Sequence, residues 1–475
     1  MGERALWTIQ ELLAATGGAL HGKINQPLNA VSIDSRGVHA GDIFVAIKGD
    51  KMDGHAFVAS ALKAGAGVAI VSNMTDEMLA AGAVLKVAGD PLRALEHMGK
   101  AARAWSQAKI IAVTGSVGKT STKEMLRTAL STSGRTHASA ASFNNHWGVP
   151  LTLSRMPRDA SFGVFEIGMN HPGEITPLVK MVRPHIAIIT IIAASHLGNF
   201  NSIDEIADAK AEIFDGLEKG GTAIINRDSA YFDRLAHAAK RNGAGAIIGF
   251  GRHKNADVKL ERVALHANCS CITADVMGEK VTYKLGTPGE HMAMNSLAVL
   301  AAVKASGADL ARAMLALADA APAKGRGVQE RLQMPGGELL LIDESYNANP
   351  TSMEAALALL AKAPVGKNGR RIAVLGDMLE LGQFGPALHA GLVEPIGMHK
   401  ADLIYAAGPL MQNLWNVLPA SKRAEYAPTS AELNDNLLNQ LRPGDAVMIK
   451  GSLGSKMGPL ADALRSKFTA VKKDS

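Results

Sequence analysis

The fold of this chain is indicated most clearly by one stretch, Val113-Thr114-Gly115-Ser116-Val117-Gly118-Lys119-Thr120-Ser121. It joins an apolar run at residues 109–113, which has the character of a buried strand, to a helical pattern that begins near Ser121. Glycines let such a turn point its backbone N–H groups at phosphate oxygens, and the helix N-terminus adds positive potential. In this setting Lys119 would reach the β- and γ-phosphates, and the Thr120 hydroxyl would ligate Mg²⁺. The sequence therefore predicts a phosphate-binding loop in which Thr114 to Ser121 bind a nucleotide.

The loop differs from the general phosphate-loop pattern at one position, because Val113 stands where that pattern has glycine. A glycine-rich turn without a ligand is the alternative. The run Gly118-Lys119-Thr120 between a strand and a helix favours the nucleotide site. These residues predict a nucleotide triphosphatase or transferase fold and leave the reaction open.

Strands and helices alternate along the rest of the 475 residues, which predicts an α/β fold with parallel, doubly wound sheets. At about 100–200 residues per domain, this length corresponds to two to four domains. We expect a first domain at residues 1–105, a central domain at 106–322 and a C-terminal, Rossmann-like domain at 323–475. The candidate linker between the last two is Ala321-Pro322-Ala323-Lys324-Gly325-Arg326-Gly327. Strands are expected at residues 31–34, 42–46, 67–71, 109–113, 162–165, 186–194, 338–343, 371–375, 402–406 and 446–450.

Composition narrows the class of protein. Hydrophobic residues make up 47% and charged residues 20%, as in ordinary globular proteins, which excludes disorder, collagen and coiled coil for most of the chain. Aromatic residues are only 4%, so we expect no nucleic-acid partner that is held by base stacking. The net charge of +6 suits anionic small molecules but is too dilute to identify a partner.

Two features bear on the compartment. Cys269 and Cys271 lie two residues apart, which puts both on one face of a strand and gives no disulfide framework, so a reducing compartment is expected. A metal pair is the alternative, but a second Cys/His pair is missing. The first 13 residues carry Glu3 and Glu11 and lack the apolar core of a signal peptide. The densest apolar run, residues 186–194, is about half the length that spans a bilayer. We therefore expect a cytoplasmic protein without a membrane segment.

Two polar residues follow strands near the phosphate loop. Glu166 ends the expected strand at 162–165, and His196 follows the run at 186–194. In parallel sheets the ligand site lies at the carboxyl ends of the strands, and a carboxylate there can hold Mg²⁺. Each residue taken alone is more often structural, but the shared edge makes both candidate site residues.

Lys210 falls on the apolar stripe of an expected helix at residues 203–217. One interpretation is a lysine whose stem packs while its ammonium reaches water. The other is a lysine that is desolvated beside the metal site, where its lowered pKa frees the amine. A free amine can add CO₂ and become a carbamate, which is an anionic oxygen ligand.

With these residues and several longer motifs, the chain resembles the Mur ligase family over essentially its whole length. The motifs of the first two segments are Asp34-Ser35-Arg36, Asp53-Gly54-His55, Ser142-Phe143-Asn144-Asn145, Glu166-Ile167-Gly168-Met169-Asn170 and Gly289-Glu290-His291 followed by Asn295. Those of the third are Asp343-Glu344-Ser345-Tyr346-Asn347-Ala348-Asn349-Pro350 and Gly376-Asp377-Met378-Leu379-Glu380-Leu381-Gly382. Two departures concern the third domain: Glu344 stands where the family often has Asp, and Leu453 where many members have Arg.

The resemblance implies a role for each matched residue. Lys119, Glu166, His196 and Lys210 would be catalytic, and Thr120, Glu166, His196 and a carbamylated Lys210 would surround Mg²⁺. Asn295 would contact the adenine of ATP, Arg326 its phosphates, and Tyr346 and Asn347 would line the nucleotide side of the third domain. The residues that would hold the UDP-linked precursor are Ser35, Arg36, Asp53, Gly54, His55, Asn144 and Asn145.

The resemblance also implies a reaction. The motifs of the third segment are typical of the family member that adds D-alanyl-D-alanine to UDP-N-acetylmuramoyl-tripeptide with ATP, in peptidoglycan synthesis. We expect a monomer. The rivals are another amino-acid-adding Mur ligase, a folylpolyglutamate synthase, and a switch or motor that hydrolyses ATP without ligation. The Ser345-Tyr346-Asn347-Ala348-Asn349-Pro350 run and the separate first domain argue against the synthase.

Overall fold

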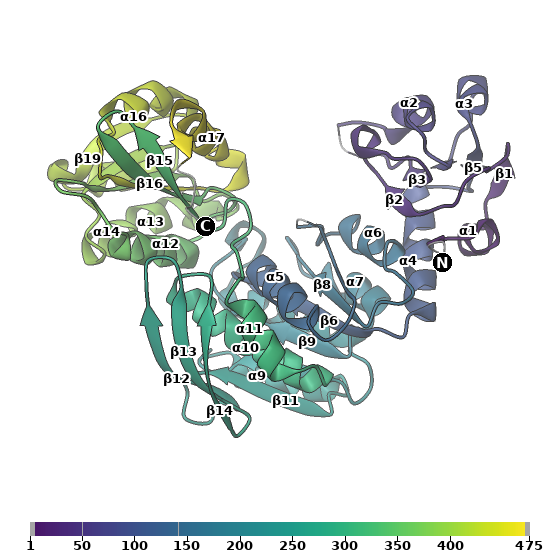
Figure 1. Ribbon diagram of the computed structural model, residues 1–475, viewed down its shortest axis with the longest axis horizontal. Coiled ribbons are helices and arrows are strands. Elements are labelled where there is room, and N and C mark those ends of the chain that lie inside the picture. The colour runs from purple at the N-terminus through teal and green to yellow at the C-terminus, as the bar shows by residue number, and fades with distance from the viewer. Residues whose placement is uncertain (1–4, 50, 141, 471–475) are drawn as a thin grey trace.

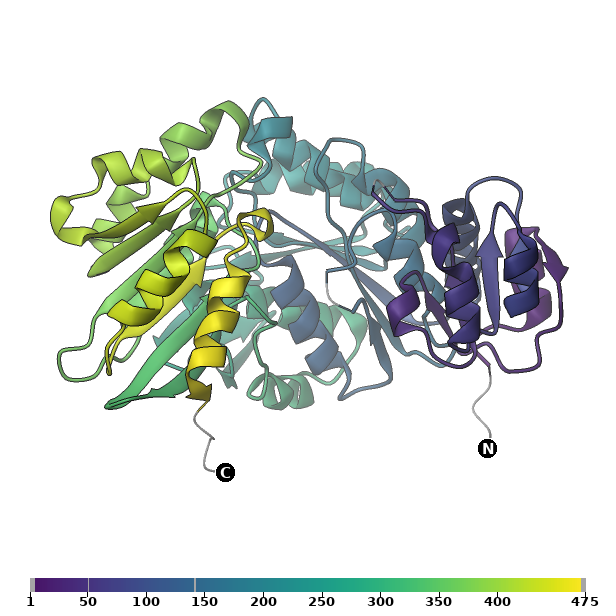
Figure 2. The same ribbon diagram turned by 90° about the horizontal axis from the view of Figure 1, so that it is seen from above.

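The computed structural model describes residues 5–49, 51–140 and 142–470 and contains three sheets, one after another along the chain. Figures 1 and 2 show the N-terminal body at one end, the C-terminal body at the other and the middle body between them. Each body has helices on both faces of a mostly parallel sheet, as the sequence predicted. Glu3 lies outside the described residues. Among those described, we find no helix with the length and apolar character that a membrane crossing needs.

The first body is a five-stranded sheet in the order β1-β5-β4-β3-β2, parallel except for β1. One of its expected strands ends early, because Asp34 accepts a hydrogen bond from the Arg36 backbone and starts the turn η1 (Ser35–Gly37). Helices α1 and α4 pack on one face, and α2 and α3 on the other. The bounds are β1 Ala19–His21, β2 Ala30–Ser32, β3 Asp42–Val45, β4 Val68–Val71, β5 Val84–Lys86, α1 Ile9–Thr16, α2 Val58–Lys63, α3 Asp76–Ala81 and α4 Pro91–Trp105.

The middle body is a nine-stranded sheet in the order β14-β13-β12-β11-β10-β9-β6-β8-β7. Its strands are β6 Lys109–Thr114, β7 Thr136–Ala138, β8 Phe162–Glu166, β9 Ile186–Ile189, β10 Thr222–Asn226, β11 Ala246–Gly251, β12 Val258–Leu265, β13 Ser270–Val276 and β14 Glu279–Leu285. Helices α5 (Lys119–Leu130), α10 (Glu290–Ser306) and α11 (Leu310–Leu317) cover one face. Helices α7 (Ile175–Val182), α8 (Ile203–Ala211) and α9 (Phe232–Arg241) cover the other, and α6 (Gly148–Ser154) packs against α4.

Three details of the middle body differ from the sequence prediction. The expected strand–helix repeat gives way to an antiparallel meander, β12-β13-β14, in which buried and exposed residues alternate because one face is solvated. Cys271 is exposed in β13, whereas Cys269 precedes the strand, and both thiols are free. The helix expected at 203–217 divides into α8 and the turn η4 (Glu212–Gly216), where the Glu212 carboxylate accepts backbone N–H bonds from Gly173, Ile175 and Thr176.

The third body is a seven-stranded sheet in the order β19-β18-β17-β20-β16-β15-β21, with antiparallel pairing only at β15. Its strands are β15 Val328–Met334, β16 Gly337–Glu344, β17 Arg371–Gly376, β18 Leu403–Ala407, β19 Arg423–Ala427, β20 Ala446–Lys450 and β21 Thr469–Ala470. Its helices are α12 Pro350–Lys362, α13 Gly385–Ala390, α14 Val393–Met398, α15 Met411–Val417, α16 Asn434–Gln440 and α17 Gly458–Lys467. The candidate linker at 321–327 lies between α11 and β15. The division at residues 105 and 322 stays a prediction.

Candidate active site

The phosphate loop lies at the carboxyl end of β6, inside the middle sheet, and α5 begins two residues earlier than expected, at Lys119. Gly118 has φ +89°, and a Cβ there would come within 2.6 Å of the Asn295 amide nitrogen. A Cβ on Gly115 would collide with the Thr190 hydroxyl, which donates at 2.6 Å to the Val117 carbonyl. Only glycine fits these two positions, because one needs a left-handed backbone and the other has no room for a side chain.

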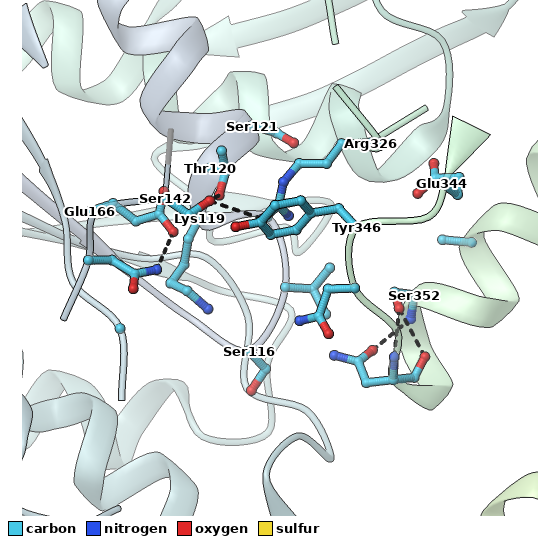
Figure 3. A pocket seen from close by; sticks show the side chains of 18 of the residues that line it. Ser116, Lys119, Thr120, Ser121, Ser142, Glu166, Arg326, Glu344, Tyr346 and Ser352 are labelled. Carbon is cyan, nitrogen blue, oxygen red and sulfur yellow. Dashed lines mark hydrogen bonds between the residues drawn. The ribbon is translucent and has the colours of Figure 1, made fainter. Parts of the chain in front are cut away.

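A cavity of about 240 Å³ opens over this loop, between the middle and third bodies. Figure 3 shows side chains of both bodies around it, with Lys119, Thr120 and Glu166 facing Arg326 and Tyr346. The Lys119 ammonium donates to the Gly115 carbonyl at 2.8 Å. Burial lowers the pKa of Lys119, and Arg326 lowers it further while Glu166 opposes the shift. Lys119 and Arg326 thus bring two basic groups to the cavity over the loop, with Glu166 as the nearby acidic group.

Glu166 ends β8 at the floor of the cavity and is 1% exposed. Its Oε1 accepts a hydrogen bond from the Asn144 amide at 2.7 Å, while its Oε2 is buried without a hydrogen-bond partner among the described residues. A buried carboxylate oxygen left unpaired is costly unless a cation or donor meets it. Thr120, which also lines the cavity, is 3% exposed, and its hydroxyl lies 3.5 Å from that of Ser142. Hydroxyl and carboxylate oxygens are ligands that Mg²⁺ accepts.

His196 also lines the cavity, but its Nδ1 faces the third body. That nitrogen lies 2.5 Å from Oε2 of Glu380, within ion-pair distance, and the proximity of His196 lowers the pKa of the Glu380 carboxyl. Only Nε2 of His196 is therefore left for a group in the cavity. Within the described part of the chain, no three His, Cys, Asp or Glu side chains gather as a metal cluster.

Lys210 is buried in α8, with 1% of its surface exposed. This excludes the interpretation of a lysine whose ammonium reaches water. Burial lowers the pKa of Lys210 well below its ordinary value, and the nearby Lys119 adds to the shift. Lys210 is thus the buried amine that the second interpretation requires, although it is not among the residues that line the cavity.

The third body supplies the opposite wall. The Arg326 guanidinium lies 4.2 Å from the centre of the Tyr346 ring, a cation–π contact, and 3.4 Å from the Ser142 hydroxyl. Asn295 on α10 abuts Gly118 from the other side. Asn347, whose carbonyl accepts a bond at 3.0 Å from the Lys450 ammonium, lines the cavity too. The sequence thus identified residues from two bodies that meet in one place.

Three ionisable residues that line the cavity had no role assigned from sequence: His291 and Glu344, which lie in quoted motifs, and Lys450, which ends the strand expected at 446–450. Lys450 ends β20 and is 2% exposed, 3.4 Å from Oε2 of Glu344. Burial lowers the pKa of Lys450 and that of His291. The sequence feature that could have identified Glu344 and Lys450 is their position at the ends of expected parallel strands, where ligand sites form.

The first-body candidates lie apart from this cavity and bond to one another. Arg36, 88% exposed in its side chain, makes a two-point contact with Asp34, which holds the pKa of that carboxyl at about 2. His55 contacts Asp53 at 2.7 Å and accepts the Ser72 N–H at 3.0 Å. Ser35 and Gly54 lie in the short turns that these two Asp residues cap.

A second cavity, of about 720 Å³, lies between α4 and α7 on the first-body side of the phosphate loop. It shares Asn144, Gly168, Met169 and Asn170 with the first cavity. Its charged lining residues are Arg93, Lys100, Glu96 and Glu174, two of each sign. Asn145 lines it as well, but its side chain accepts the backbone N–H groups of Trp147 and Gly148, where α6 begins. The two cavities therefore adjoin at Asn144.

Comparisons with known proteins agree with this geometry. Models described as "Mur ligase family, catalytic domain", "Mur ligase middle domain" and "Mur ligase, glutamate ligase domain" match residues 27–129, 113–303 and 330–453. A UDP-N-acetylmuramoyl-tripeptide–D-alanyl-D-alanine ligase of Rickettsia prowazekii is 32% identical over 96% of this chain and 99% of its own. The crystal structure of MurF from Acinetobacter baumannii is 33% identical over 97% of this chain and 99% of its own, with a TM-score of 0.83. The MurF ligase of Thermotoga maritima in complex with ADP shares the fold, at 23% identity over 93% of this chain and 98% of its own, with a TM-score of 0.75.

Proposed function

The chain belongs to the Mur ligase family, and we propose that it joins D-alanyl-D-alanine to UDP-N-acetylmuramoyl-tripeptide with hydrolysis of ATP. The product is the UDP-linked pentapeptide precursor of peptidoglycan. The observation that carries the proposal is the near-complete match to ligases of that name, combined with a phosphate-loop cavity closed by a second domain. The same match disfavours the rival that hydrolyses ATP without ligating anything.

ATP would lie in the 240 Å³ cavity with its phosphates on the loop. The phosphates would lie at the N-terminus of α5, which begins at Lys119, and would bind the loop amides as in other phosphate loops. Asn295 would contact the adenine, and Tyr346 and Asn347 the nucleotide from the third domain. Arg326 stacks on Tyr346, which holds its guanidinium in place for the phosphate oxygens.

Mg²⁺ fits the residues present, because Glu166 Oε2 is buried without a hydrogen-bond partner among the described residues and Thr120 lines the same cavity. Glu166, Thr120, His196 through Nε2 and a carbamylated Lys210 would hold it. Bound there, Mg²⁺ would neutralise charge on the transferring phosphoryl group. Asn144 keeps the Glu166 carboxylate oriented by occupying its other oxygen.

The chemical difficulty is that a carboxylate must attack a polyanion. The terminal carboxylate of the tripeptide attacks the γ-phosphorus, and the bond between the γ-phosphorus and the bridging oxygen breaks. ADP departs, and the tripeptide now carries an acyl phosphate. Lys119, the loop amides and Arg326 lower the repulsion and stabilise the charge that spreads over the phosphoryl oxygens. The dipeptide amine then attacks the acyl carbon and loses one proton to solvent or to the departing phosphate, and inorganic phosphate leaves with the C–O electron pair.

Lys210 is proposed to act as a carbamate. Its neutral amine attacks CO₂, forms an N–C bond and releases one proton, which leaves an anionic oxygen ligand. Burial supports this, because it lowers the pKa of the amine and so makes the neutral form available. The added negative charge also offsets the nearby Lys119.

Water must be kept from the acyl phosphate, so the third domain is proposed to close over the loop. The segment 323–327 is the candidate hinge between domains at 106–322 and 323–475. The domain at 1–105 would hold the UDP part through Ser35, Arg36, Asp53, Gly54 and His55. The second cavity, which helix α4 of that domain lines, adjoins the phosphate-loop cavity. We propose a cytoplasmic monomer; the third residue of the tripeptide stays open.

An isotope experiment tests the acyl phosphate. The tripeptide carboxylate is labelled with ¹⁸O, ligation is run to completion, and the released phosphate is analysed by mass. The proposal expects one ¹⁸O in each phosphate molecule, because the bond between carbon and labelled oxygen breaks in the second step. Unlabelled phosphate would show that water, and not the carboxylate, attacks ATP.

A further inference from the structure

The middle and third domains touch at a contact around Glu380, a residue to which the proposed function gives no role. The turn η3 (Leu197–Asn199) of the middle domain meets the segment before η5 (Gly382–Phe384) of the third. The His196 ring contacts the Glu380 carboxylate at 2.5 Å, and the Gly198 N–H donates to the Glu380 carbonyl at 2.9 Å. Glu380 therefore holds the same turn with its side chain and with its backbone.

The backbones at this contact are shaped for close approach. A Cβ on Gly382 would lie 2.7 Å from the Cα of Gly198, and one on Gly198 would lie 3.0 Å from the Gly382 nitrogen. Glu380 and His196 both have positive φ, of +64° and +56°. Such angles are uncommon in residues other than glycine and persist where the surroundings impose them. The contact thus has a defined geometry on both domains.

The contact also reaches the cavities. His196 lines the phosphate-loop cavity, and Asn199 of the same turn donates at 3.0 Å to the carbonyl of Asn170. Asn170 lines both cavities. Movement of the third domain at Glu380 would therefore displace the cavity wall. On the proposed function, the tripeptide carboxylate meets the dipeptide at this wall.

We propose that Glu380 is a positioning residue that joins His196 and η3 to the closed third domain. By occupying Nδ1, the Glu380 carboxylate fixes the orientation of the imidazole and leaves Nε2 for the reacting groups. The same contact keeps the two domains together while the acyl phosphate exists. This inference rests on the proposed function and adds to it the residue that couples closure to the cavity wall.

The test compares Glu380→Ala and Glu380→Gln with Glu394→Ala, which removes an exposed carboxylate from the same domain. Ligation is followed as ADP and pentapeptide released per turnover. Glu380→Ala should form pentapeptide about 10- to 100-fold more slowly and release more ADP than pentapeptide, because the acyl phosphate meets water. Glu380→Gln keeps an acceptor for the ring and should be intermediate, and Glu394→Ala should match the wild type.

A second readout does not depend on activity. Small-angle X-ray scattering of the ligand-free chain should give a larger radius of gyration for Glu380→Ala than for Glu394→Ala and the wild type. Tight coupling of ADP to pentapeptide in Glu380→Ala, or an unchanged radius, would overturn the inference. A wild type that makes no pentapeptide would instead refute the proposed function, and the scattering result would still decide whether Glu380 joins the domains.

Discussion

Two groups of candidate residues behave differently in the structure. Those around the phosphate loop come from distant parts of the chain and meet in one cavity, where one Glu166 oxygen is buried without a hydrogen-bond partner among the described residues and Lys119 is half-buried. Those of the first domain are exposed or lie in short turns, and Arg36 and His55 are already bonded to Asp34 and Asp53. Unpaired, buried charge indicates a site that awaits a ligand, whereas locally paired charge does not distinguish a binding surface from a stable turn.

The largest expected effect lies in the cavity. Lys119→Ala should lower ligation at least about 1,000-fold, because it removes the cation nearest the phosphoryl oxygens. The fold should survive, since the Lys119 ammonium donates only to the Gly115 carbonyl within its own loop. Turnover and thermal unfolding are measured together, with the exposed Lys240→Ala as control. Near-normal turnover in Lys119→Ala would remove the basis for the phosphate-loop assignment.

A loss of about 100-fold or more is expected for Lys210→Ala, because a metal-binding carbamate supplies charge that Ala lacks. Added short carboxylic acids should restore part of the rate by occupying the vacated space. Depletion of bicarbonate should slow the wild type and leave Lys210→Ala unchanged. If kcat of Lys210→Ala stays near normal, or if bicarbonate depletion has no effect on the wild type, the proposal that Lys210 is carbamylated is wrong.

A smaller effect is expected in the first domain. Arg36→Ala should raise KM for the UDP precursor about tenfold and leave KM for ATP unchanged. The contacts of Arg36 with the precursor would be equal in the ground and transition states, so their loss appears in KM. Initial rates with one substrate varied at a time measure both constants. An equal effect on the two KM values would mean that Arg36 serves the turn and that the precursor binds elsewhere.

The smallest effect concerns stability and pH. The pKa of Lys210 is lowered from its ordinary value of 10.5, so the unfolded chain binds this proton at a pH where the folded chain does not. In protein kept free of bicarbonate and Mg²⁺, so that Lys210 is a free amine, wild-type stability should therefore fall as pH drops from 10 towards the folded pKa, and Lys210→Met should lack this part of the loss. Melting temperatures of the two proteins should diverge by a few degrees as pH is lowered. A constant difference, with Lys240→Met as control, would contradict the burial argument.

The sequence predicted what depends on short spacing. The loop from Thr114 to Ser121 needs glycines, a lysine and a strand–helix junction within a few residues, and all are visible in the sequence. The alternation of strands and helices likewise predicted the fold class. Burial of Lys210 was one of two interpretations of its place on an apolar stripe, and only packing could decide between them.

What the sequence did not predict depends on contacts between distant residues. Glu212 ends α8 because its carboxylate meets backbone N–H groups near the start of α7. Glu380 lies in a quoted motif, but its contact with His196 forms only when two domains meet. The meander β12-β13-β14 is a different case, because its alternation of period two is the pattern of half-buried strands and the prediction of a continuous strand–helix repeat overlooked it.

Phosphate release distinguishes ligation driven by ATP from simple hydrolysis of ATP in the closed cavity. The purified chain is given ATP, Mg²⁺ and UDP-N-acetylmuramoyl-tripeptide, with and without D-alanyl-D-alanine, and both phosphate and pentapeptide are measured. If the chain is a ligase, we expect sustained phosphate release only when the dipeptide is present, with one pentapeptide formed for each phosphate. Sustained release that ignores the dipeptide, without pentapeptide, would contradict it.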